Sequence, residues 1–136
     1  MINLEPIDTN TPDFGELYDE LPLWSAPFGL WILDRVPLRP GLKVLDLGAG
    51  TGFLTVELAE RGGSDSTVIA VDPWQAAMAR LQRKVDQRKL ANVRLMVQDA
   101  ATLALPDRSV DVIVSNLGVN NFDNAAAVWQ QCSRVA

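Results

Sequence analysis

Short apolar runs alternate with longer amphipathic segments along this chain, and a polar residue closes each apolar run. The runs are rich in aliphatic and β-branched residues, which is typical of buried strands, whereas the segments between them repeat apolar residues at helical spacing. The pattern predicts strands over residues 43–47, 67–71, 93–97 and 110–115, helices over residues 53–61 and 73–89, a short segment over residues 100–105, and a last helix from Phe122 onward. Strands and helices therefore alternate through most of the chain.

The N-terminal part has a different pattern. Residues 1–12 are mostly polar and contain prolines, so we expect them to be irregular. Large apolar residues are dense after that point, and we place a single domain over residues 13–136. Within it, a helix capped by Ser25 would bring Phe28, Trp31, Ile32 and Val36 onto one face.

Helices of this length between strands indicate parallel pairing through right-handed crossovers, with helices on both faces of the sheet. The predicted fold class is therefore α/β, a doubly wound parallel sheet in a three-layer αβα arrangement. In such sheets, ligands bind beyond the carboxyl ends of the strands. A glycine-rich turn, Asp72, Asp99 and Asn116 all follow predicted strands, so we expect them to form one site.

The turn after the first predicted strand carries glycines at alternate positions, namely Gly48, Gly50 and Gly52. Glycine lets the backbone approach a ligand because no Cβ intervenes. A dinucleotide site of the pattern G-x-G-x-x-G needs a small residue where this chain has Phe53, and Asp46 would repel a pyrophosphate. Asp46 instead suits a ligand with a cationic amino group. A Walker-type phosphate loop is excluded, because no Gly-Lys-Ser/Thr sequence follows.

Composition narrows the chemistry further. The 136 residues allow one modest domain, and a net charge of -5 argues against a nucleic-acid partner. The chain lacks histidine, the commonest general base and metal ligand, and Cys132 is its only cysteine, so we expect neither a metal site nor an internal disulfide. No apolar run has the length of a membrane span and no signal-peptide pattern is present, so we expect a cytoplasmic protein without a membrane partner.

Four segments, in order, resemble the motifs of class I S-adenosylmethionine-dependent methyltransferases. They are residues 44–52, 68–72, 97–100 and 111–117. The resemblance extends from about Asp13 to the C-terminus, and it implies a Rossmann-like fold and S-adenosylmethionine as the cofactor. The sequences around Tyr18 and Asn116 are similar to the branch that acts on small molecules and quinone precursors.

The resemblance also implies roles for individual positions. Asp46 would attract the amino group of the cofactor, and Asp72 would accept both ribose hydroxyls. Asp99 would accept from the adenine amine, whereas Trp74 would either stack on adenine or pack in the core. The predicted cofactor-binding residues are Asp46, Gly48, Ala49, Gly50, Gly52, Asp72, Pro73, Trp74, Asp99, Ala100, Asn116 and Leu117.

The sequence indicates less about the side of the site that would bind the methyl acceptor. A sulfonium already carries an activated methyl group, so its transfer depends mainly on holding the acceptor in place. We identify no catalytic residue, and name Asn116 and Tyr18 as candidates for the acceptor side.

Members of this family usually continue through three more strands after the helix that ends here near Val135. We therefore expect an incomplete domain without the last three strands, whose fourth strand is an open edge available for self-association. Two functions stay open. One is methyl transfer from S-adenosylmethionine to a small-molecule acceptor; the other is a cofactor-binding half-domain without activity, completed by self-association or by another chain.

Overall fold

The structure of the protein is a computed structural model that describes residues 6–136. The strands are β1 (Lys43–Leu47), β2 (Thr67–Val71), β3 (Val93–Met96) and β4 (Val112–Val114). The α-helices are α1 (Pro12–Asp19), α2 (Ala26–Leu33), α3 (Phe53–Gly62), α4 (Gln75–Arg88) and α5 (Ala125–Val135), and the short 3₁₀ helices are η1 (Pro22–Trp24), η2 (Ala100–Thr102) and η3 (Gly118–Asn121). The irregular segment expected over residues 1–12 lies partly outside the described residues, and its last residue begins α1.

The strands form one parallel sheet in the order β3-β2-β1-β4. Leu45 of β1 lies beside Ile69 of β2 on one side and beside Ile113 of β4 on the other. The chain thus runs outward from β1 in one direction to β3 and then returns to the opposite side for β4. The point where the strand order reverses is therefore at β1, and in such sheets ligands bind beyond the carboxyl ends of the strands at that point.

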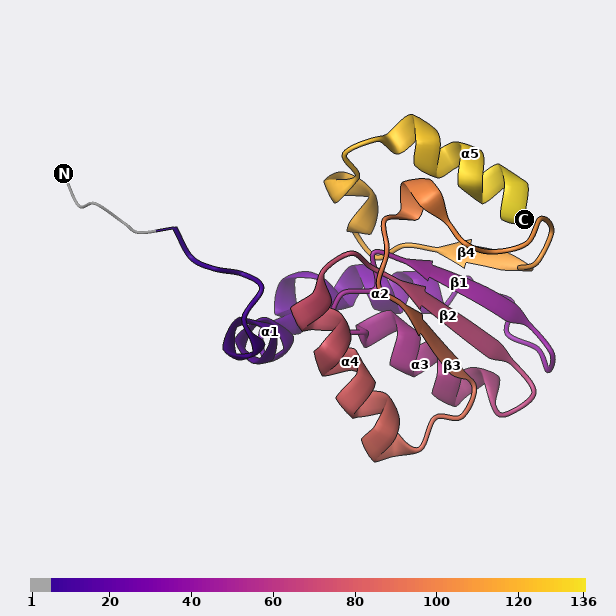
Figure 1. The fold of residues 1–136 in the computed structure, drawn as a ribbon. Helices are drawn as coiled ribbons and strands as arrows, with labels where there is room; N and C mark the ends of the chain where they lie inside the picture. The colour runs from indigo at the N-terminus through magenta and orange to yellow at the C-terminus, as the bar shows by residue number, and fades with distance from the viewer. Residues whose placement is uncertain (1–5) are drawn as a thin grey trace.

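Helices cover both faces of the sheet (Figure 1). On one face, Val44 and Val68 pack with Leu58 of α3, and α4 covers the neighbouring part of that face. On the other face, Leu45 and other strand residues pack with Val128 of α5 and with the segment around η2. The predicted α/β fold with three layers and a parallel sheet is confirmed, and the sheet is partial.

Several element boundaries differ from the sequence-based expectation. The fourth strand is shorter than residues 110–115, because the ends of this edge strand have a partner on one side only. The third strand ends before Val97, which is exposed. Helix α4 begins two residues later than expected, with Trp74 as its N-cap residue instead of part of its apolar stripe.

Helix α1 is held on α4 by ion pairs. Arg80 contacts both Glu16 and Asp19, Lys84 contacts Asp19, and Arg83 contacts Glu16. Burial raises the pKa of Asp19, but hydrogen bonds and charges from Lys84 and its other partners outweigh burial and leave that pKa below its ordinary value. The basic side of α4, which the helical pattern alone assigns to solvent, therefore holds another helix in place.

The apolar face expected for α2 packs only in part, through Ile32 and the following Val36. Gly29 and Leu33 are the buried residues of this helix, whereas Phe28 is 53% and Trp31 is 60% exposed. Trp31 instead lies under the guanidinium group of Arg35, 3.6 Å from its ring centre. Ser25 occupies the N-cap position but makes no side-chain capping hydrogen bond. Within residues 6–136, every helix is too short or too polar to cross a membrane.

Candidate cofactor site

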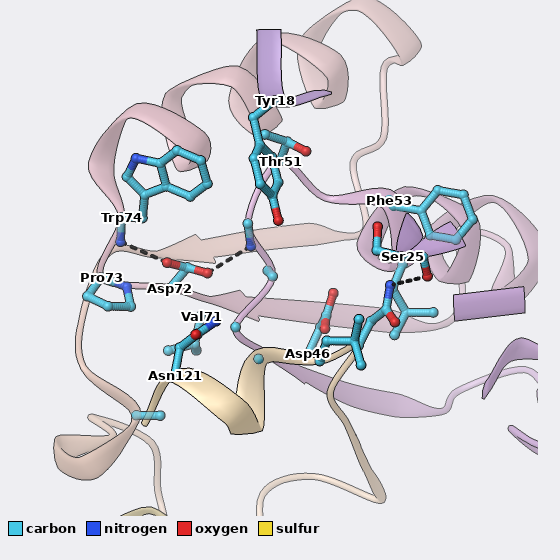
Figure 2. A pocket seen from close by; sticks show the side chains of 18 of the residues that line it. Tyr18, Ser25, Asp46, Thr51, Phe53, Val71, Asp72, Pro73, Trp74 and Asn121 are labelled. Carbon is cyan, nitrogen blue, oxygen red and sulfur yellow. Dashed lines mark hydrogen bonds between the residues drawn. The ribbon is translucent and has the colours of Figure 1, made fainter. Parts of the chain in front are cut away.

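A cavity of about 560 Å³ opens at the carboxyl end of the sheet, in the volume range typical of small-molecule sites (Figure 2). The turns after β1, β2 and β4 form its floor, and α1 and the start of α2 contribute to its walls. All of the predicted cofactor-binding residues except Gly52 line it. The predicted residues in the lining are Asp46, Gly48, Ala49, Gly50, Asp72, Pro73, Trp74, Asp99, Ala100, Asn116 and Leu117. Both acceptor-side candidates also lie there, since Tyr18 is part of the wall.

The glycines of the turn after β1 have different surroundings, although all have a positive φ. A Cβ at Gly50 would meet no atom within 4 Å, so this position presents bare backbone to open space. A Cβ at Gly48 would lie 2.7 Å from the Cα of Gly118, because the turns after β1 and β4 touch through their backbones. A Cβ at Gly52 would overlap the side chain of Leu81 in α4. The structure therefore places Gly52 in the packing between α3 and α4 and away from the cavity.

Asp72 connects the turn after β1 with the start of α4. Its two carboxylate oxygens accept hydrogen bonds from the backbone N–H groups of Gly50 and Trp74, each at 2.8 Å (Figure 2). Burial raises the pKa of Asp72, and the two backbone hydrogen bonds partly offset that rise. Each carboxylate oxygen has a second lone pair, so both oxygens can still accept from a ligand hydroxyl.

Asp46 is the most deeply buried acid in the cavity wall, with 1% of its surface exposed. The Thr55 hydroxyl donates to its Oδ2 at 2.6 Å, whereas its Oδ1 has no hydrogen-bond partner. Burial, reinforced by the nearby charge of Asp72, raises the pKa of Asp46 to about 7 despite the hydrogen bond from Thr55. A buried acceptor without a partner costs on the order of 1–3 kcal/mol, so a ligand that donates to Oδ1 would be stabilised there.

The wall beyond β4 contains a second buried acceptor without a partner. Asn116 donates through Nδ2 to the backbone oxygen of Ser25 at 3.3 Å, and its Oδ1 has no partner (Figure 2). The next residue, Leu117, has a φ of 65°, a left-handed conformation that costs a residue with a side chain about 1 kcal/mol or more. This turn thus directs a polar side chain and a strained backbone segment toward the cavity.

Aromatic side chains form the side of the cavity next to α1. Tyr18 packs edge-on against Trp74, with 5.0 Å between ring centres, and Phe14 lies on another side of Trp74. The Trp74 indole N–H donates to the backbone oxygen of Thr9, and the side chain of Asn10 accepts from the backbone N–H of Ala76. Figure 2 shows the Tyr18 hydroxyl pointing into the cavity, toward the glycine turn and Asp72.

These contacts were only partly predictable. Trp74 lies at the N-cap of α4 and lines the cavity, so its stacking on adenine stays a prediction, and its indole also binds the segment before α1. Asp99 lines the cavity as expected, and its carboxylate also accepts from the N–H of Ala101 and so caps η2. The sequence reasoning missed further lining residues, because only the folded chain brings their segments together. They include Thr9, Phe14, Ser25, Thr51, Phe53, Asn121, Phe122 and Asp123.

The lining residues fit the cofactor that the sequence resemblance implies. An adenosyl ligand with a cationic amino group would supply the donor that Asp46 Oδ1 lacks, and the backbone at Gly50 leaves space beside it. Among the described residues, no lysine or arginine lines the cavity. A pyrophosphate would therefore find no basic side chain in this lining, although the N-terminus of α3 borders the cavity.

Comparison with known proteins places the chain in a family. The sequence profile of a family described as "Methyltransferase domain" matches residues 44–136. The chain belongs to this methyltransferase family. A solved relative, a SAM-dependent methyltransferase from Aquifex aeolicus, superimposes with a TM-score of 0.80 at 25% identity, over 93% of this chain and 67% of that one. The family and Rossmann-like fold inferred from the four motifs are therefore confirmed.

Two curated relatives show how much of the chain is similar to known methyltransferases. The demethylmenaquinone methyltransferase of Corynebacterium efficiens is 35% identical over 98% of this chain and 57% of its own length. The nocamycin O-methyltransferase of Saccharothrix syringae is 30% identical over 80% of this chain and 39% of its own length. The chain thus spans about half the length of the curated relatives that it matches.

Proposed function

We propose that this protein binds S-adenosylmethionine in the cavity and transfers its methyl group to a small-molecule acceptor. The observation that carries the proposal is Asp46, a buried residue of the cavity wall whose Oδ1 has no partner, together with Gly50, which also lines the cavity and leaves open space where a side chain would begin. Membership of the methyltransferase family and the relatives named above support the same assignment.

In the proposed complex, different residues bind different parts of the cofactor. When bound, the cofactor supplies a methyl group activated by a positively charged sulfur. Asp46 receives the amino group, and Asp72 accepts the ribose hydroxyls with the lone pairs that its backbone hydrogen bonds leave free. Asp99 accepts from the adenine amine, and the backbone of Ala100 completes that end of the site.

The acceptor side is formed by the turn after β4 and by the aromatic wall. Asn116 Oδ1 has no partner, and the Tyr18 hydroxyl points into the same cavity, so both can orient an acceptor. Burial raises the pKa of Tyr18, and the charge of Asp72 adds to that rise, so this hydroxyl acts as a hydrogen-bond donor at neutral pH. Holding two reactants in line can lower a barrier by about 7–11 kcal/mol in favourable cases. We assign no general base.

A cofactor-binding module without activity is the second candidate. The similarity to the Corynebacterium efficiens relative covers 57% of that protein's length. In this case the cavity binds the cofactor, and a second copy or another chain completes it. The cytoplasmic location and the absence of a nucleic-acid or membrane partner stay predictions.

Titration calorimetry with S-adenosylmethionine, S-adenosylhomocysteine and NAD tests the assignment of the cavity. We expect the two sulfur-containing ligands to bind and NAD to bind far more weakly. Asp72→Ala should weaken binding by about 1–3 kcal/mol, since the ribose hydroxyls lose their acceptors, whereas the exposed Asp65→Ala serves as a control with unchanged affinity. Binding of NAD alone would overturn the proposal. An assay for transfer of a labelled methyl group to a quinone precursor then distinguishes the two candidate functions, because only the enzyme would transfer the label.

A further inference from the structure

Thr55 fixes the orientation of the buried carboxylate of Asp46. Thr55 lies in α3, has no exposed surface, and donates its hydroxyl proton to Asp46 Oδ2 at 2.6 Å. Because Oδ2 is occupied in this way, Oδ1 is the carboxylate oxygen left for a ligand. The sequence patterns that mark the site do not include Thr55.

No described cation balances the charge of Asp46. No lysine or arginine among residues 6–136 lines the cavity, and none of the ion pairs found there includes this carboxylate. Thr55 faces it from α3, the uncharged Ser25 and Asn116 share its cavity, and Asp72 at the end of β2 adds a like charge. The titratable side chains that line the cavity with Asp46 are Tyr18, Asp72, Asp99 and Asp123. An ionised Asp46 in the empty cavity would therefore be buried without a counter-charge, which is costly.

We propose that Asp46 carries a proton while the cavity is empty, that the cationic amino group of the ligand displaces this proton, and that Thr55 is the positioning residue that controls the exchange. The inference rests on the proposed binding of S-adenosylmethionine. On binding, the carboxylic acid of Asp46 loses its proton to solvent and the ammonium group of the ligand takes its place. The ion pair formed is neutral overall, as the protonated acid was before it.

The exchange makes the Asp46–Thr55 pair a determinant of ligand specificity. A nucleoside that lacks the amino group cannot compensate the ionised carboxylate, so its binding should release no proton. For a ligand with the amino group, binding needs ionised Asp46, whose pKa is about 7 in the empty protein. Affinity should therefore level off above pH 7, as long as the amino group of the ligand stays protonated, and should fall by up to about tenfold for each pH unit below it.

Calorimetry of S-adenosylhomocysteine binding in two buffers of different ionisation enthalpy measures the protons released. The release should approach one proton per ligand at pH values well below the pKa of Asp46 and should fall toward zero well above it. Methylthioadenosine, which keeps the nucleoside and lacks the amino group, should release none. Binding of S-adenosylhomocysteine with no proton release and a flat pH profile would overturn this inference alone. Absence of binding at every pH would instead overturn the proposed function.

Three variants separate proton exchange from general damage. Asp46→Asn should bind S-adenosylhomocysteine more weakly and release no proton from residue 46. Any proton release that remains in this variant measures a change in protonation of the ligand itself. Thr55→Val removes the hydroxyl hydrogen bond that favours the ionised carboxylate and keeps the backbone contribution of Thr55, so the midpoint of the pH profile should move upward. Thr55→Ser keeps the hydroxyl and should restore the original midpoint. An unchanged midpoint in folded Thr55→Val would contradict the role of Thr55.

Discussion

Gly50 and Gly52 lie two positions apart in the turn after β1, and both need a left-handed backbone, with φ of 54° and 86°. The two glycines differ in what surrounds them. Gly50 has open space where a side chain would begin, so in the proposed site the missing side chain leaves room for the ligand. Gly52 is buried against Leu81, and because it has no side chain, α3 can pack closely on α4.

This difference predicts opposite effects of the same substitution. Gly50→Ala should lower the free energy of unfolding by only about 1 kcal/mol, the cost of the left-handed backbone, yet it should weaken binding of S-adenosylhomocysteine strongly. Gly52→Ala adds overpacking against Leu81, which costs about 1–3 kcal/mol or more, so the fold itself should lose stability. Urea unfolding and calorimetry on both variants check this. A Gly50→Ala variant with normal affinity would remove Gly50 from the site.

At the scale of elements, α1 forms part of the cavity wall, and α4 holds it there. Asp19 and Glu16 are bound by basic side chains of α4, while Trp74 and Ala76 bind the segment before α1 through Thr9 and Asn10. Only 13% of the Asp19 side chain is exposed, so its ion pairs are less screened by solvent than ordinary surface pairs. The position of Tyr18 over the turn after β1 therefore depends on contacts made outside the cavity.

The same elements show what the sequence could and could not predict. Strand-end residues such as Asp46 and Asp72 were identifiable, because parallel strands must bring their carboxyl ends to one edge of the sheet. The contact between Gly48 and Gly118 was not identifiable, because it joins turns that are 70 positions apart in the sequence and no periodic pattern marks it. The ion pairs of α1 were missed for the same reason. The basic residues of α4 have the spacing of an exposed helix face, and only the position of α1 shows that they are paired.

At the scale of the whole molecule, the described sheet is open at β4. This strand pairs with β1 on one side, and no described strand pairs with its other side. Asp111 donates its backbone N–H to Lys43, so the N–H of Val112, one position along, points away from β1. Unpaired edges of this kind favour association with another strand.

We therefore expect copies of this chain to associate through the outer edge of β4, and light scattering measures their mass in solution. Val112→Pro removes an outward N–H without removing the hydrogen bond from Asp111 to β1, so it should shift the chain toward the monomer. Val93→Pro at the opposite edge strand serves as the matched control and should leave the mass unchanged. A strictly monomeric parent chain would contradict the expectation.

The central claim is that an adenosyl ligand binds over the turn after β1, with its amino group on Asp46. A crystal structure of the protein with S-adenosylhomocysteine tests it most directly. We predict that the ligand amino group lies within hydrogen-bond distance of Asp46 Oδ1 and that the ribose hydroxyls lie on Asp72. Density for the ligand at a place remote from Gly50 and Asp46 would contradict the account.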